Sequence, residues 1–241
     1  MEPFYQDDLV TIYHGDCREI LPQLDVKVDL VLTDPPYPNM RGGSKYTSYH
    51  RGVLGKRGVY TTQGDTWQAS LDWLPLAWQV LTKGLLVFCS FHSVDEFPKL
   101  IDGKRVALIA WHKRNCPPCS QNAPHFTVEF IWAFQKAPGL RWKSLKTFYD
   151  IPKLSTGACA SKERYVDETG KAVHPTQKPR SLVLKLLIVE PELVLDPFLG
   201  TGTTCACAKE LGYHSIGIEM EEKYCEIAAL RCCQVEAGVK K

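Results

Sequence analysis

The sequence predicts an α/β fold with a seven-stranded, mostly parallel sheet and helices on both faces. Two observations carry this prediction. Seven short runs are rich in Val, Ile, Leu and aromatic residues, as buried parallel strands are, and segments with helical periodicity lie between them. Such alternation of strands and helices favours a parallel sheet. A chain of 241 residues suits one domain covering 1–241.

The elements follow in chain order. The expected strands are LVTIYH from Leu9, VDLVLT from Val28, LLVFCS from Leu85, VALIAW from Val106, VEFIWAF from Val128, LVLD from Leu193 and SIGIE from Ser215. Four helical segments are marked by apolar residues three or four positions apart and by glycine or proline at their ends. They are Trp67 to Leu81 ending at Gly84, Leu182 to Val189 after Pro179, Thr203 to Leu211 ending at Gly212, and Glu222 to Val235 ending near Gly238.

The composition is that of an ordinary folded protein. Hydrophobic residues make up 44% of the chain, charged residues 23%, and the net charge is +2. The first ten residues, MEPFYQDDLV, lack the basic and apolar regions of an export signal, and no apolar run is long enough to span a membrane. We therefore expect a cytoplasmic protein with reduced cysteines. Helical spacing predicts that Cys225, Cys232 and Cys233 pack in the core.

The strand from Val28 ends in an unusual way, at Asp34-Pro35-Pro36-Tyr37. Neither proline can donate a hydrogen bond to a sheet, so the strand has to stop there. A plain turn explains a Pro-Pro pair equally well when the pair is considered alone. In parallel sheets, however, ligands bind beyond the carboxyl ends of the strands, so the position itself favours a site.

A second strand end carries the sequence DPFLGTGTT. Here the strand ends at Asp196, Gly200 and Gly202 lie in the following loop, and a helix begins near Thr203. Glycines let a backbone approach a ligand closely, and a helix start offers unpaired N–H donors. The spacing fits neither the dinucleotide-binding G-x-G-x-x-G nor a P-loop. Glu219 ends the next strand and could accept the ribose hydroxyls of an adenosine. Taken singly, the glycines could be a tight turn and Glu219 a solvated acid.

These motifs together resemble the beta class of amino-group DNA methyltransferases. DPFLGTGTT is similar to the S-adenosylmethionine motif of that family, and TDPPY is similar to its catalytic motif. The catalytic motif comes first, which is the circularly permuted order of the beta class. IYHGDCREIL from Ile12 and HPTQKP from His174 resemble two further family segments. The resemblance extends from about Leu9 to Arg231 and implies a Rossmann-like methyltransferase fold.

The resemblance implies methyl transfer to the N6 amine of adenine in DNA, with the target base flipped out of the duplex. Asp34 and the carbonyl of Pro35 or Pro36 would accept the two amine hydrogens and stabilise the developing positive charge. Tyr37 would stack on the base. Because the sulfonium of the cofactor is already an activated leaving group, we expect no metal site.

The cofactor, S-adenosyl-L-methionine, would contact residues from four segments. Asp16 is expected at the adenine and Glu219 at the ribose. The floor under the methionine end and the sulfur would be formed by Asp196, Phe198, Gly200, Thr201 and Gly202. The candidates for the methionine carboxylate are His174, Thr176 and Lys178, although a lysine at a helix start is more often solvated.

Double-stranded DNA is the expected partner, with no membrane involved. The loop at about 39–64 contains Arg41, Lys45, Arg51, Lys56 and Arg57 without an acid, interleaved with tyrosines, which suits phosphate contacts. The segment at about 113–164 occupies the place of the family's target-recognition insertion and is short. A homodimer and a cognate restriction endonuclease remain open as partners.

Several alternatives remain beside adenine methylation. Cytosine N4 is the first, although family members of that kind more often have Ser where this chain has Asp34. RNA or protein-amide methylation is less compatible, because related motifs usually begin with Asn. A DNA-binding protein of the same fold without activity would be expected to have a damaged motif, and every chemical position is filled here. Cys116, Cys119 and His125 form only half of a zinc site.

Overall fold

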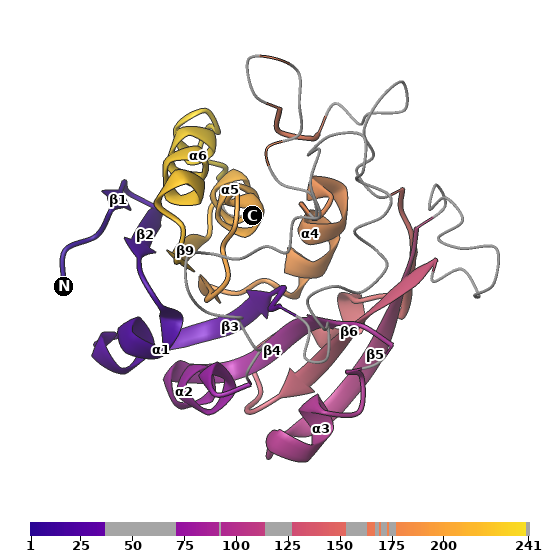
Figure 1. The fold of residues 1–241 in the computed structure, drawn as a ribbon. Coiled ribbons are helices and arrows are strands. Elements are labelled where there is room, and N and C mark those ends of the chain that lie inside the picture. The colour runs from indigo at the N-terminus through magenta and orange to yellow at the C-terminus, as the bar shows by residue number, and fades with distance from the viewer. Residues whose placement is uncertain are drawn as a thin grey trace, which may run out of the picture.

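The computed structural model describes residues 1–36, 71–91, 93–113, 127–152, 163–166, 169, 173 and 177–239. Its centre is a nine-stranded sheet (Figure 1). The strands are β1 (Tyr5–Gln6), β2 (Val10–His14), β3 (Val28–Thr33), β4 (Leu81–Cys89), β5 (Lys104–His112), β6 (Val128–Gln135), β7 (Phe148–Asp150), β8 (Leu193–Asp196) and β9 (His214–Glu219). The α-helices are α1 (Cys17–Ile20), α2 (Trp73–Val80), α3 (Phe97–Leu100), α4 (Arg180–Leu186), α5 (Thr203–Glu210) and α6 (Glu222–Cys233). Short 3-10 helices are η1 (Leu21–Gln23), η3 (Trp142–Ser144) and η5 (Leu187–Val189).

All seven predicted strands are present, and the prediction of a mostly parallel sheet is confirmed. The strand order is β1-β2-β9-β8-β3-β4-β6-β5-β7. Neighbours from β2 to β4 are parallel, whereas β6 runs antiparallel to both β4 and β5. The two strands that the sequence did not predict, β1 and β7, are two and three residues long and lie at the outer edges.

Helices cover both faces of the sheet, as predicted (Figure 1). Alternation along β3 directs Leu30 and Leu32 into a cluster with α4 and α5, and Val31 into a second cluster with α1, α2 and α3. These three side chains are at most 1% exposed. Since full burial of such a side chain stabilises the fold by about 1.5–3 kcal/mol, the central strands are fixed firmly in register.

The boundary between α2 and β4 differs from the prediction. Helical periodicity placed Leu81 in the helix and Gly84 at its end, but β4 already begins at Leu81. Leu81 pairs with Val28 of β3, so sheet pairing overrides the helical pattern at this position. Gly84 lies within β4, paired with Leu30 and Gln135, and the ring of Trp142 packs against it. A Cβ atom there would lie 2.2 Å from Cζ2 of the Trp142 ring.

The carboxyl ends of β2, β9, β8, β3 and β4 lie along one edge of the sheet, because these strands are parallel neighbours. The reversed direction of β6 brings its amino end, with Glu129, to the same edge: Cys89 near the end of β4 pairs with Phe130. We call this edge the carboxyl edge. It is the place where an α/β sheet binds its ligands.

The cysteine prediction is correct except at one position. Cys225 and Cys232 are fully buried on α6, and Cys205 and Cys207 are buried on α5. Cys233 is exposed, because the residue next to Cys232 is rotated about 100° around the helix and leaves the core. Across the part of the chain that is described, no helix combines the length and the apolar character needed to cross a membrane.

Candidate active site

The carboxyl edge brings together residues that are far apart in the sequence. β3 leads into Asp34, β8 ends at Asp196, β9 ends at Glu219, and Asp16 follows β2. A direct contact joins the first two: the hydroxyl of Thr33 donates a 2.7 Å hydrogen bond to Oδ1 of Asp196. The motif that resembles a catalytic site and the motif that resembles a cofactor site are therefore adjacent.

The two prolines have the effect on the strand that the sequence predicts. Pro35 is buried and Pro36 is exposed, and β3 ends at Thr33. Since proline contributes a carbonyl but no N–H, Pro35 and Pro36 offer acceptors and no donors at this strand end. Asp34 is half-buried at the same point. The Tyr37 ring lies outside the described residues.

Asp34 belongs to a row of alternating charges. Its Oδ2 pairs with Nζ of Lys178, which also lies 3.5 Å from Oε2 of Glu129. Oε1 of Glu129 pairs with Nζ of Lys113 at 2.9 Å. Burial alone would raise the pKa of Glu129, but the two lysines more than offset this and lower it to about 2. Lys178, which was expected either to be solvated or to bind a cofactor carboxylate, is only 12% exposed.

Asp196 is a buried carboxylate that accepts three hydrogen bonds. Oδ1 accepts from Thr33 and, at 3.1 Å, from the N–H of Phe198, while Oδ2 accepts from the hydroxyl of Thr204 at 2.6 Å. Burial raises the pKa of Asp196 to about 6 against the opposing effect of these hydrogen bonds, and the nearby charge of Asp34 raises it further. Asp196 therefore joins the end of β3 to the start of α5.

The loop between β8 and α5 requires its glycines. Gly200 and Gly202 have φ values of +54° and +81°, in the left-handed region that favours glycine. A Cβ atom on Gly202 would lie 2.7 Å from Cβ of Ala228 in α6. Thr201 is buried, and its carbonyl accepts a 2.5 Å hydrogen bond from Arg231. The loop is thus held close to α6 at the point where α5 begins.

Glu219 is positioned by the same loop. Its Oε2 accepts from the N–H of Gly200 at 2.8 Å, and its Oε1 accepts from the N–H of Glu221 at 2.9 Å. Burial raises the pKa of Glu219 against these hydrogen bonds. Because each carboxylate oxygen has two lone pairs, Glu219 retains acceptor capacity for a pair of hydroxyl groups. A glycine-rich loop, a helix start and an acid with spare acceptors fit an adenosine-containing ligand.

Asp16 has a local structural role in addition to its place at the carboxyl edge. It caps α1 by accepting from the N–H of Arg18 at 2.9 Å, and its carboxylate also pairs with the Arg18 guanidinium. The hydrogen bonds from Arg18 hold the pKa of Asp16 below its ordinary value, although burial opposes them. The carboxylate is therefore oriented and ionised next to the end of β2.

Comparisons with known proteins agree with this geometry. The model of a DNA methylase family that acts on N6 or N4 amino groups matches residues 28–230, which is most of the chain. The chain belongs to this family. It is therefore an amino-group DNA methyltransferase, and the resemblance found in the motifs is confirmed.

Two relatives and two solved structures illustrate the relationship. The type II methyltransferase M.HinfI of Haemophilus influenzae is 30% identical over 98% of this chain and 72% of its own length. M2.LlaDCHI of Lactococcus lactis subsp. cremoris is 27% identical over 95% of this chain and 91% of its own. The M1.HpyAVI–SAM complex superposes with a TM-score of 0.61 at 25% identity, covering 92% of this chain and all of that one. The cytosine-N4-specific PvuII methyltransferase, at 20% identity, covers 95% of this chain and 88% of its own with a TM-score of 0.67, and it supports the fold alone.

Some residues predicted for this methyltransferase site lie outside the described residues. They are Tyr37, His174 and Thr176, the basic loop at about 39–64, and the half zinc site of Cys116, Cys119 and His125. The segment at about 113–164 is described in part and contains β6 and β7. Next to His174 and Thr176, Gln177 is buried and anchors its segment. Its side-chain amide accepts from the N–H of Tyr165 at 3.1 Å and donates to the carbonyl of Glu163 at 3.0 Å.

Sequence reasoning missed several residues that organise the site. Thr33 and Thr204 hold Asp196, and Glu129 and Lys113 extend the row of charges from Asp34. A signal for Glu129 was present, because it is an acid near the start of an otherwise apolar strand, where an unpaired charge would be costly. Its partner Lys178 is distant in sequence and could not have been paired with it by spacing alone.

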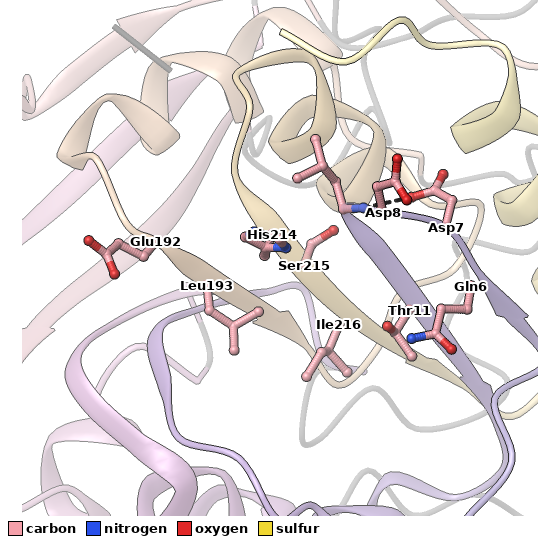
Figure 2. A pocket seen from close by; sticks show the side chains of 10 residues that line it. Gln6, Asp7, Asp8, Thr11, Glu192, Leu193, His214, Ser215 and Ile216 are labelled. Carbon is pink, nitrogen blue, oxygen red and sulfur yellow. Dashed lines mark hydrogen bonds between the residues drawn. The ribbon is translucent and has the colours of Figure 1, made fainter. Parts of the chain in front are cut away.

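The hollow drawn in Figure 2 is a different feature from the methyltransferase site. Its volume is about 370 Å³, and its lining includes Gln6, Asp7, Glu192 and His214. His214 begins β9 and Glu192 precedes β8, so the hollow lies at the amino ends of these strands. The residues of the catalytic and cofactor motifs are at the opposite edge of the sheet.

Proposed function

We propose that this chain transfers a methyl group from S-adenosylmethionine to the N6 amine of adenine in double-stranded DNA. One observation carries the proposal: half-buried Asp34 directly follows Thr33, and the hydroxyl of Thr33 donates a hydrogen bond to Asp196, the residue from which the glycine-rich loop starts. An amine held by Asp34 would therefore be close to a methyl donor held by the loop. Such proximity is the main requirement of a direct transfer.

The residues that would hold the methyl donor come from both sides of the loop. Glu219 would accept the ribose hydroxyls, Asp16 would lie near the adenine, and the backbone from Phe198 to Gly202 would support the methionine end. His174 and Thr176 remain proposed contacts for the methionine carboxylate, whereas the ammonium of Lys178, the third candidate, pairs with Asp34. When bound, S-adenosylmethionine supplies an electrophilic methyl group on a sulfonium. The M1.HpyAVI structure contains this cofactor, which supports the assignment.

The task of Asp34 follows from the chemistry of the amine. The lone pair of an exocyclic amine is delocalised into the base, which makes the nitrogen a poor nucleophile. Hydrogen bonds from its two hydrogens to Asp34 and to a carbonyl of Pro35 or Pro36 favour a pyramidal nitrogen and stabilise its growing positive charge. Tyr37 would stack on the flipped base and hold it in line with the methyl group.

The choice of adenine rests on the acid at the first position of the catalytic motif. Family members that modify cytosine N4 more often have Ser there, so Asp34 favours adenine. Cytosine N4 is the second candidate. A protein of this fold that binds DNA without methylating it is less compatible with the intact row from Asp34 to Lys113.

We further propose that the chain acts as one catalytic domain. The loop at about 39–64 would contact DNA phosphates, and the segment at about 113–164 would read the target sequence. Relatives named type II methyltransferases support a place in a restriction–modification system beside a cognate endonuclease. A homodimer is proposed as well, to be tested by sedimentation.

The experiment that tests the reaction uses purified protein, unmethylated duplex DNA of mixed sequence, and S-adenosylmethionine with a deuterated methyl group. The DNA is digested to nucleosides and analysed by mass spectrometry. Label on N6-methyladenine is expected, whereas label on N4-methylcytosine would change the base and keep the mechanism. Label on neither base, with cofactor binding shown by calorimetry, would reject methylation of duplex DNA.

The Asp34→Ala variant tests the role of the carboxylate. We expect methyl transfer to fall by at least about a hundredfold, because one preorganised electrostatic contact in an active site is typically worth that much. Cofactor affinity should stay within about twofold, since Asp34 lies outside the proposed cofactor contacts. Wild-type activity in this variant would show that the carboxylate has no catalytic role.

A further inference from the structure

The row of charges beside Asp34 is the feature that the proposed reaction leaves unexplained. It consists of Lys113, Glu129, Lys178 and Asp34, with positive and negative charges in alternation. Exposures of the four side chains are 12%, 21%, 12% and 25%. Burying four charged groups is costly unless each is paired. A row of this kind next to the carboxylate proposed to act in catalysis therefore calls for a functional explanation.

Lys178 is held from several directions. Its ammonium pairs with Oδ2 of Asp34, lies 3.5 Å from Oε2 of Glu129, and stands 5.0 Å from the centre of the Phe88 ring. A lysine side chain normally has considerable rotamer freedom. Glu129 and Phe88, on neighbouring strands β6 and β4, therefore restrict the ammonium to the side of Asp34.

We propose that Lys178 and Glu129 are positioning residues for Asp34: Glu129 holds the ammonium of Lys178, and that ammonium fixes the orientation and the charge of the Asp34 carboxylate for the target amine. The inference rests on the proposed function, because it assigns these residues to the same reaction. Lys113 holds the other oxygen of Glu129, at 2.9 Å, and thereby completes the row.

The arrangement suits an acceptor that must not become a donor. A protonated carboxyl would offer the amine a hydrogen in place of a lone pair, and an adjacent ammonium favours the ionised form. The ammonium uses Oδ2, and a carboxylate has about four acceptor positions over its two oxygens, so a substrate hydrogen can still be accepted. Lys178 thus orients Asp34 without blocking it.

The charge states of the partners agree with this role. Burial would lower the pKa of Lys178, but Asp34 and Glu129 outweigh it and raise the pKa above its ordinary value. The pKa of Glu129 is lowered to about 2. Both residues are therefore charged throughout the pH range in which a methyltransferase would be assayed.

A role of Lys178 in binding the cofactor carboxylate predicts a different result. In that case its loss would weaken S-adenosylmethionine binding and leave the rate at saturating cofactor almost unchanged. As a positioning residue, Lys178 would affect the rate of transfer and leave cofactor affinity intact. The two roles are separated by measuring both quantities for the same variants.

The test compares Lys178→Met, Lys178→Arg, Glu129→Gln and the double variant Glu129→Gln with Lys178→Met. Single-turnover transfer to duplex DNA avoids masking by slow product release, and calorimetry gives the affinity for S-adenosylmethionine. Lys83→Met is the matched control, because Lys83 pairs at 2.9 Å with another aspartate of β3, Asp29, at the amino edge of the sheet. The control should transfer methyl groups at the wild-type rate.

We expect Lys178→Met to slow transfer about a hundredfold and Glu129→Gln roughly tenfold, with cofactor affinity within about twofold of wild type. Arginine keeps the charge, so Lys178→Arg should recover a substantial part of the rate lost in Lys178→Met. The double variant should be no slower than Lys178→Met, because Glu129 acts through Lys178.

Three results would overturn the inference while leaving the proposed function intact: a weakened cofactor affinity with an unchanged transfer rate in Lys178→Met, a wild-type rate in Glu129→Gln, or slowing in the double variant that equals the product of the single effects. A wild-type chain that methylates neither adenine nor cytosine would instead remove the proposed function and this inference together. Circular dichroism of each variant shows whether it is folded, and Glu129→Gln, nearly the same size as the original, keeps the test valid if Lys178→Met does not fold.

Discussion

Replacing Asp196 by Asn tests whether burial disfavours the ionised form of this carboxyl group, which lies between the two motifs. Burial raises its pKa from the ordinary 3.8 to about 6, and a difference of this size corresponds to about 3 kcal/mol. A raised carboxyl pKa means that the folded state favours the protonated form. The stability that this contributes is complete below pH 3.8 and is lost as the pH rises through about 6.

Asn is neutral at every pH and can accept from Thr33 and from the N–H of Phe198 while donating to the hydroxyl of Thr204. The variant should therefore gain stability relative to wild type as the pH rises, by about 2 kcal/mol between about pH 4 and pH 7.5. Urea unfolding of both proteins at each pH gives the difference, in which the other titrating groups largely cancel. A difference that stays constant between the two pH values would refute the argument that Asp196 has a raised pKa.

Two further predictions concern the cofactor loop. Gly202→Ala should lower the free energy of unfolding by about 3 kcal/mol, because it combines a left-handed φ with a 2.7 Å approach to Cβ of Ala228; an unchanged urea midpoint would contradict this. Glu219→Ala should weaken S-adenosylmethionine binding roughly tenfold or more by removing charged acceptors from the ribose, and Glu219→Gln, which keeps one carbonyl oxygen, should bind with intermediate affinity. Affinities equal to wild type by calorimetry would remove Glu219 from the cofactor site.

The sheet could be predicted because its strands carry a local signal. The seven apolar runs are each long enough to cross a core, and glycine or proline lies close to several of their ends. The boundary at Leu81 could not be predicted, since Leu81 satisfies the helical period and is assigned to β4 only by its partner Val28 in a distant strand. The same limit applies to Gly84, whose lack of a side chain leaves room for the ring of the distant Trp142.

The motifs located the site, but not the contacts within it. Each motif, DPPY and DPFLGTGTT, is an unbroken stretch of sequence. Asp34, Asp196 and the loop glycines could therefore be named from spacing and resemblance. The pairing of Lys178 with Asp34 and Glu129 joins three segments separated by long stretches of chain, and it depends on β6 running in the reverse direction. Strand direction is a property of the assembled sheet, and for this reason Glu129 was not expected at the carboxyl edge.

Three acids at the carboxyl edge show how different surroundings give the same carboxylate group different roles. Asp34 faces an ammonium, which favours the ionised form of a carboxyl group and suits an acceptor for a nitrogen that becomes positive. Asp196 is enclosed by two hydroxyls and an N–H, and burial raises its pKa, which suits a bridge within the fold better than a contact with substrate. Glu219 accepts two backbone N–H groups and retains lone pairs for a ligand. Because the differences arise from neighbours that are remote in sequence, removing a neighbour should change the acid that it contacts. Loss of Lys178 removes the charge that favours the ionised form of Asp34, whereas loss of Thr204 removes a hydrogen bond that lowers the pKa of Asp196 and makes Asp196 harder to ionise.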